Sequence, residues 1–219
     1  MLESMSVNLV NETARDWVIG MDWDTDSLTD FYEGAIAEIL IFDKDLTPQD
    51  SAKIRYYLSR KWDLEESVDS DSDGFIDDFE ENIGTSPIDA TEMPSGDLSD
   101  AVDSQIGAAS DLGDIESSLK LWLDASNVDS KSNATLSNND QVPIWLELSG
   151  NGHHARQLNL DYAPTFDSSA IVFNGVDDFY SLDSFKDELS TGYTIIKVFK
   201  ATKSSGGAGR QILFSMHTG

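Results

Sequence analysis

Residues 34 to 42 read Gly-Ala-Ile-Ala-Glu-Ile-Leu-Ile-Phe, an apolar run with a single charged residue. Both alternating sets of side chains in this run are mostly apolar, which is typical of a β-strand that is covered on both faces. Such a strand cannot stay exposed to water, because burying one large apolar side chain contributes roughly 1.5–3 kcal/mol. We therefore expect a core strand whose cover comes from another part of the chain.

The residues that follow this strand predict a short helix. Thr47 suits the N-cap, Pro48 the first helical position, and Asp50 the third, where an acid supports the start of a helix. Apolar residues then recur at helical spacing at Ile54, Tyr57, Leu58 and Trp62. Ahead of the core strand, the apolar run from Asp16 to Met21 is expected to form another strand.

The last hundred residues contain only strand signals. Short β-branched or aromatic runs alternate with Gly-rich turns, which predicts a β-sandwich or jelly roll. The expected strands are Leu119–Asp124, Ala170–Gly175, Phe179–Asp183, Tyr193–Ala201 and Arg210–His217. We expect these strands to cover the run 34–42, either within one chain or between two exchanged chains.

The acidic residues are concentrated in the middle of the chain. No basic residue lies between Lys61 and Lys120, while eighteen Asp and Glu lie from Asp63 to Glu116, so this stretch is expected to be a linker with a flexible spacer from Ser95 to Asp114. A net charge of −27 argues against nucleic acid and anionic membrane surfaces as partners and favours cations. No apolar run approaches the roughly 18 residues of a membrane span, and no signal peptide follows Met1.

Within this linker, residues 69 to 80 read Asp-Ser-Asp-Ser-Asp-Gly-Phe-Ile-Asp-Asp-Phe-Glu. The stretch has the spacing of a twelve-residue calcium loop, in which oxygen ligands occupy positions 1, 3, 5, 7, 9 and 12 and a glycine takes the sharp turn at position 6. The expected ligands are Asp69, Asp71, Asp73, the Phe75 carbonyl, Asp77 and Glu80, with Gly74 at the turn. The alternative is an acidic linker with a chance Asp-Gly turn. The spacing favours one bound Ca²⁺.

Several motifs resemble a known family, the laminin G-like, concanavalin A-like jelly-roll domains of large bacterial surface proteins. The opening half of such a domain is similar to Leu121–Ser126, Trp145, Ser149–Ala155 and Phe173–Phe179, and the closing half to Trp17–Gly20, Tyr32–Leu40, Asp43–Thr47 and Tyr57–Trp62. The calcium loop and the residues up to Asp89 resemble a bacterial thrombospondin type 3 repeat. The next repeat, Ser95–Asp100, has lost most of its ligands, so the resemblance implies one good site.

The resemblance divides the chain into a closing half at 1–64, an acidic linker at 65–116 with its calcium loop at 69–80, and an opening half at 117–219. The two halves stand in reversed order. One explanation is that the sequence is a segment of a tandem array of domains, which begins inside one jelly-roll domain and ends inside the next. The rival explanation is a circular permutation in which the halves close on each other. The tandem-array explanation is favoured, because the middle strands of the family's domain have no counterpart in this sequence.

Enzyme signatures are weak in this sequence. The chain has no cysteine, no Gly-x-Ser-x-Gly nucleophile motif and only three histidines. We therefore expect no enzyme. The resemblance implies a calcium-binding, non-catalytic extracellular module for adhesion or carbohydrate recognition within a larger surface protein. The alternative is an accessory segment of a secreted polysaccharide-degrading enzyme.

A glycan or surface-protein ligand would be expected at loops on the rim of the sandwich, since binding residues are usually displayed there on a rigid scaffold. The candidate residues are His153, His154, Asp177 and Asp178. A structural alternative exists for each pair. The histidines follow a Gly-rich turn and are suited to packing, whereas the two aspartates are suited to forming a turn.

Overall fold

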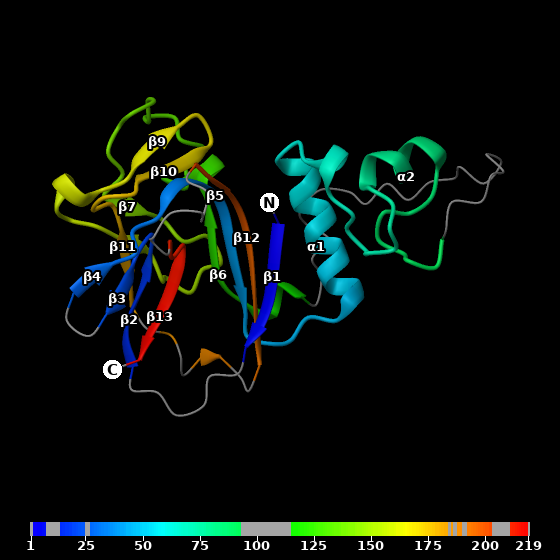
Figure 1. Cartoon of the computed structure of the whole chain (residues 1–219), viewed down its shortest axis with the longest axis horizontal. Helices are drawn as coiled ribbons and strands as arrows, with labels where there is room; N and C mark the ends of the chain where they lie inside the picture. The colour runs from blue at the N-terminus through cyan, green and yellow to red at the C-terminus, as the bar shows by residue number, and fades with distance from the viewer. Residues whose placement is uncertain are drawn as a thin grey trace. The chain divides into compact units, whose positions relative to one another are not determined.

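The computed structural model describes residues 2–7, 14–24, 27–92, 115–183, 185, 188–189, 192–202 and 211–218. It is a mainly β protein with two antiparallel sheets and two short helices (Figure 1). The chain divides into two compact units, which we call the sheet unit, Glu3–Lys44 with Leu119–Gly219, and the loop unit, Asp45–Ser118. In the described part of the chain, no helix has the length and apolar character needed to cross a membrane.

The larger sheet is built around β5, which spans Glu33–Phe42 and confirms the expected core strand. One edge of β5 pairs with β12, while the other edge is shared, with β10 alongside Glu33–Ile36 and β6 alongside Glu38–Phe42. The other strands of this sheet are β1 (Leu2–Val7), β12 (Tyr193–Ala201), β10 (Ala170–Asn174), β9 (Thr165–Asp167) and β6 (Leu119–Asp124). The segments before and after the linker therefore close on each other within one chain, which is the arrangement that the permutation alternative requires.

A β-bulge decides which side chains of β5 enter the core. Val198 pairs with Glu38 and the next residue, Phe199, pairs with Ile36, so Ala37 is the extra residue. As a result Ile36 and Ile39 share the same core cluster although they are three residues apart. Leu40 and Phe42 are buried as well, which agrees with the expectation that this strand is covered on both faces.

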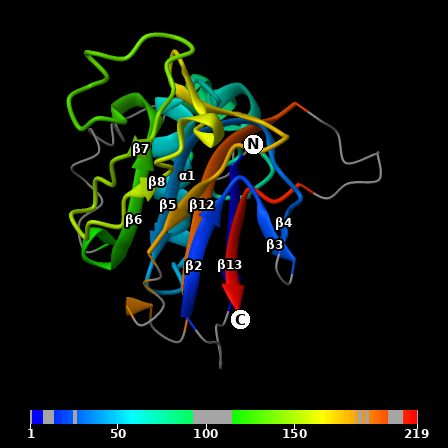
Figure 2. The same ribbon diagram turned by 90° about the vertical axis from the view of Figure 1, so that its left-hand side faces the viewer.

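The smaller sheet has five strands, and its inner face contributes to the same core as the larger sheet. They are β13 (Phe214–Thr218), β2 (Ala14–Ile19), β11 (Tyr180–Leu182), β8 (Ala155–Arg156) and β7 (Ile144–Trp145). Trp17 and Trp145 of this sheet belong to one hydrophobic cluster with Leu123 and Ile195 of the other, so the sheets form a sandwich. Figure 2 shows β2 and β13 nearer the viewer than β5 and β12.

The expected strands are present with shifted ends, but four further strands, β1, β7, β8 and β9, were not expected from the sequence. The last strand begins at Phe214 rather than at residue 210. The chain after the linker is not made only of strands, because 3₁₀ turns lie at Ala125–Asn127 and Leu160–Tyr162. A short hairpin, β3 (Asp22–Asp24) with β4 (Ser27–Thr29), was not expected either. The expected spacer Ser95–Asp114 and the second repeat lie outside the described residues.

The loop unit contains α1 (Pro48–Lys61), a 3₁₀ turn η1 (Glu65–Ser67) and α2 (Asp77–Ile83). Helix α1 begins as expected, because the Thr47 side chain accepts a hydrogen bond from the Asp50 amide at 3.1 Å. Its buried side chains, Ala52, Ile54, Tyr56, Leu58 and Ser59, include only two of the four expected stripe residues. The helix belongs to the same compact unit as the loop 69–80, whereas the sequence predicted that it belongs to the preceding half, 1–64.

Candidate metal centre

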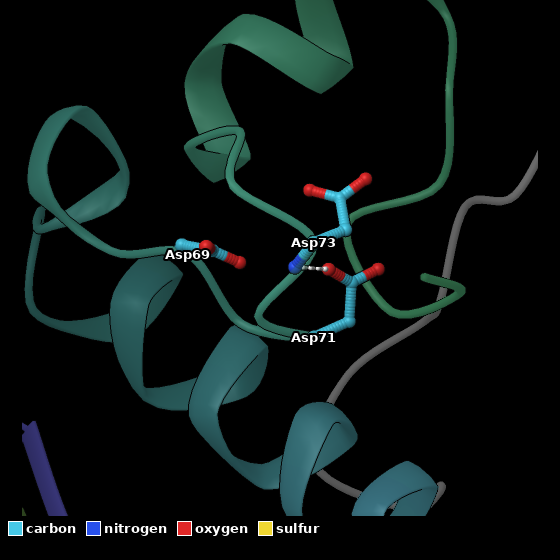
Figure 3. A group of neighbouring side chains, drawn as sticks. All are labelled: Asp69, Asp71 and Asp73. Atoms are coloured by element: carbon cyan, nitrogen blue, oxygen red, sulfur yellow. Dashed lines mark hydrogen bonds between the residues drawn. The ribbon is translucent and has the colours of Figure 1, made fainter. Parts of the chain in front are cut away.

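The calcium-like loop lies between η1 and α2 and brings three carboxylates together. Asp69, Asp71 and Asp73 are partly exposed, and each offers an oxygen within 4.8 Å of the others (Figure 3). These residues occupy alternate positions of the loop. This group could hold a metal ion.

Hydrogen bonds from backbone amides hold the loop in this shape. Asp69 accepts from the amides of Ser72 and Gly74 at 2.6 and 3.0 Å, and Asp73 accepts from the Phe75 amide at 2.9 Å. Gly74 has a φ of +105°, a conformation that glycine adopts without steric cost, while the space around its Cα is open. The glycine expected at the sharp turn is thus required by conformation and not by close packing.

Three carboxylate oxygens at this site have no hydrogen-bond partner within the described part of the chain: Asp71 Oδ2, Asp73 Oδ2 and Glu80 Oε2. Glu80 is fully buried on α2. Burial, followed by the negative charges of Asp71 and Asp73, raises the pKa of Glu80 to about 8. A buried carboxylate without a partner is costly unless a cation or a proton neutralises it.

Asp77 is placed differently from the other expected ligands. It is fully buried, and both of its carboxylate oxygens accept hydrogen bonds, Oδ1 from the Ser70 amide at 2.8 Å and Oδ2 from the hydroxyls of Ser70 and Ser59 at 2.8 and 2.5 Å. Its pKa is raised by burial, and these hydrogen bonds act in the opposite direction. The sixth expected ligand is the Phe75 carbonyl. The Phe75 ring stacks on Phe79 with 5.6 Å between centroids.

Helix α1 supplies contacts to the loop that the sequence analysis missed. Arg55 donates to the Asp69 carbonyl at 2.7 Å and to the Ser72 hydroxyl at 3.2 Å. Tyr56, the next residue, and Arg60, one turn after Tyr56, both donate to Glu81 Oε1, at 2.7 and 3.0 Å. The sequence contains a partial signal for these contacts, because Arg55 and Ser59, and likewise Tyr56 and Arg60, are polar residues spaced by one helical turn just ahead of the loop. No local sequence rule predicts which residues they contact.

The four candidate rim residues all make contacts inside the sheet unit. The His153 ring stacks on Phe185 at 4.2 Å, and its Nε2 lies within ion-pair distance of Glu188 Oε1 at 3.1 Å without hydrogen-bond alignment. His154 Nδ1 accepts from the Glu147 amide at 3.0 Å.

The two aspartates lie in a closed turn. Asp177 Oδ1 accepts from the Asn174 side chain and Asp178 Oδ2 from the Asn174 amide, both at 2.8 Å. Burial raises the pKa of Asp178 to about 6. The packing and turn-forming roles are therefore the ones that the described contacts support.

Comparison with known proteins adds no further assignment. The chain matches no protein-family model, no curated protein and no solved structure. The interpretation of the site depends on its own geometry.

Proposed function

We propose that this chain is a calcium-binding, non-catalytic module in which the loop 69–80 holds one Ca²⁺. The observation that carries the proposal is the set of three partnerless oxygens, on Asp71, Asp73 and the fully buried Glu80, next to the carboxylate of Asp69. A cation held by the aspartates would supply a partner for the unpaired oxygens of Asp71 and Asp73 and would offset the negative charges that act on Glu80.

The chemistry of these donors favours calcium over other cations. All of them are oxygens, which excludes the sulfur and nitrogen ligands typical of zinc. Ca²⁺ accepts 6–8 oxygen ligands in flexible geometry, whereas Mg²⁺ demands near-octahedral geometry and keeps several waters. Three aspartates, a backbone carbonyl at Phe75 and a bidentate Glu80 would supply most of that shell. Asp69 can take part although it accepts two amides, because each carboxylate oxygen has two lone pairs.

The resemblance to laminin G-like domains and thrombospondin type 3 repeats supports a broader proposal. The module would act outside the cell, in adhesion or carbohydrate recognition, as part of a larger surface protein. An affinity of roughly 10⁻⁴–10⁻³ M is expected for such an extracellular site. Such a site would fill according to the calcium concentration of the medium, and the bound ion would serve the structure of the loop unit.

Calorimetric titration of the whole chain with Ca²⁺ tests this proposal. We expect one site, and we expect Asp73→Asn and Glu80→Gln each to weaken binding at least about tenfold, because each removes a charged ligand. Asp78→Asn is the matched control: Asp78 is next to Asp77 on α2, is partly exposed and accepts from Asn82. Unchanged titrations in both ligand variants would show that the site lies elsewhere.

A further inference from the structure

Asp77 lies in a buried polar cluster that the twelve-residue loop pattern does not explain. Its two oxygens receive three donors, two from Ser70 within the loop and one from Ser59 on α1. Ser59 also lies 3.0 Å from the Tyr56 carbonyl. A hydroxyl has a single proton, and the shorter contact of 2.5 Å assigns it to the Asp77 carboxylate.

Burial and the number of donors distinguish Asp77 from the proposed ligands. Asp71, Asp73 and Glu80 each keep an oxygen without a partner within the described part of the chain, whereas Asp77 accepts hydrogen bonds at both oxygens. Asp69 also accepts at both oxygens, but from one amide at each, and it is partly exposed within the group of three aspartates, whereas Asp77 is fully buried and lies outside that group. Moving Asp77 to an ion would leave the Ser59 hydroxyl and the Ser70 amide without their acceptor in a buried place, which is unfavourable.

The same cluster fixes the beginning of α2. Asp77 is the first residue of this helix, and its amide donates to the Val68 carbonyl at 2.8 Å. Glu80 follows one turn later, so its direction depends on how the helix starts. A helix of seven residues is too short to be stable alone, and its position must come from tertiary contacts.

Helix α1 holds the loop at both of its ends. Arg55 binds the carbonyl of Asp69, the first loop residue, and Ser59, one turn later, binds Asp77 near the last loop residues. Because both contacts come from one face of one helix, they set the separation between the triad and Glu80.

We propose that Asp77 is a positioning residue and not a calcium ligand, and that with Ser59 it orients α2 so that Glu80 faces the aspartate triad. This inference rests on the proposed calcium function. Residues that hold a metal's ligands in place typically affect affinity by about 10- to 100-fold when they are replaced.

Two substitutions of Asp77 separate the two roles in calcium titrations of the whole chain. Asp77→Asn keeps an acceptor for the Ser70 amide, and its NH₂ group can donate to the two hydroxyls, so we expect binding within about threefold of the charge-matched control Asp78→Asn. Asp77→Ala removes the cluster and is expected to weaken binding at least about tenfold. Ser59→Ala removes one contact and should weaken binding by a smaller factor, with the fold checked by circular dichroism.

Luminescence lifetimes of bound Tb³⁺ in H₂O and D₂O count the waters on the ion. At saturation, Asp77→Asn and Ser59→Ala should keep the wild-type count, while Glu80→Gln should add about one or two waters. The inference is overturned if Asp77→Asn binds as weakly as Glu80→Gln with a raised water count, or if Ser59→Ala and Asp77→Ala both bind like the wild type. Absence of binding in the wild type itself would instead reject the proposed function.

Discussion

At the scale of single residues, two buried carboxylates show how the surroundings decide the role of an acid. Asp178 closes a turn in which Asn174 donates its backbone amide and accepts the Val176 amide at 2.8 Å. Within the described part of the chain, Glu80 has one distant hydroxyl near one oxygen, Thr85 at 3.5 Å, and no hydrogen-bond partner at the other. The fold supplies a hydrogen-bond donor to the Asp178 carboxylate. The Glu80 carboxylate instead requires a cation or a proton.

The pH dependence of stability should reveal the burial of Asp178. Its folded-state pKa of about 6 lies above the ordinary value of 3.8, so the native state keeps a proton that the unfolded chain releases, and the unfolding free energy contributed by this group falls as pH rises through that window. Asp178→Asn has no proton to lose and can still accept the Asn174 amide. We expect its stability relative to wild type, measured by urea unfolding, to increase from pH 4 to pH 7. If the difference in unfolding free energy between the variant and the wild type is the same at pH 4 and pH 7, this prediction is contradicted.

At the scale of elements, α1 shows which features of a helix can be predicted from local sequence rules and which cannot. Its start follows from Thr47 and Pro48, and its last turn carries Arg60 and Lys61, which complement the negative end of the helix dipole. Which face is buried does not follow from these rules. Tyr56 and Ser59 are buried because they bind Glu81 and Asp77 of α2.

The N-cap of α1 can be tested by substitution. Thr47→Ala removes the acceptor for the Asp50 amide and should lower the unfolding free energy by about 1 kcal/mol. Thr47→Ser keeps the hydroxyl and serves as the control. Chemical denaturation followed by far-ultraviolet circular dichroism measures both. An equal loss in the two variants would mean that the hydroxyl does not stabilise the helix.

At the scale of the whole molecule, the sheet unit is assembled from two segments separated by the loop unit. Strand β5 pairs with three strands that all follow the linker. Joining distant segments costs little extra entropy, because the cost of closing a loop grows only with the logarithm of its length. The free energy gained by burying the apolar area of the shared core therefore exceeds the entropy cost of joining segments that are distant along the chain.

Core substitutions on either side of the linker should act on one cooperative transition. Ile19 and Leu123 are fully buried, belong to different sheets and share the core cluster. Ile19→Ala and Leu123→Ala should each cost about 2–5 kcal/mol, and both should shift the same transition in urea unfolding followed by tryptophan fluorescence. Two transitions, each sensitive to only one substitution, would argue for separate folding of the segments.

The features that the sequence determined by itself are local ones. The start of α1, the core strand β5 and the positive φ of Gly74 follow from residues a few positions apart, since caps, strand patterns and turns depend on nearby backbone geometry. The expectation that Asp69, Asp71 and Asp73 converge also follows from local spacing, because alternate positions in a tight loop can approach one another, while Arg55 of α1 adds a contact to this loop from outside it.

The tertiary structure decided the features that depend on distant partners. The bulge at Ala37 and the sharing of one β5 edge between β10 and β6 arise from pairing across the linker. The short strands β7 to β9 depend on partners that also follow the linker, since β7 pairs with β8, β8 with β11 and β9 with β10. The hydrogen bonds to the buried Asp77 include one from Ser59, whose hydroxyl reaches it from another helix. A sequence pattern specifies which groups can bind an ion, but burial and hydrogen-bond partners decide which of them are free to do so, and these are fixed only when distant segments meet.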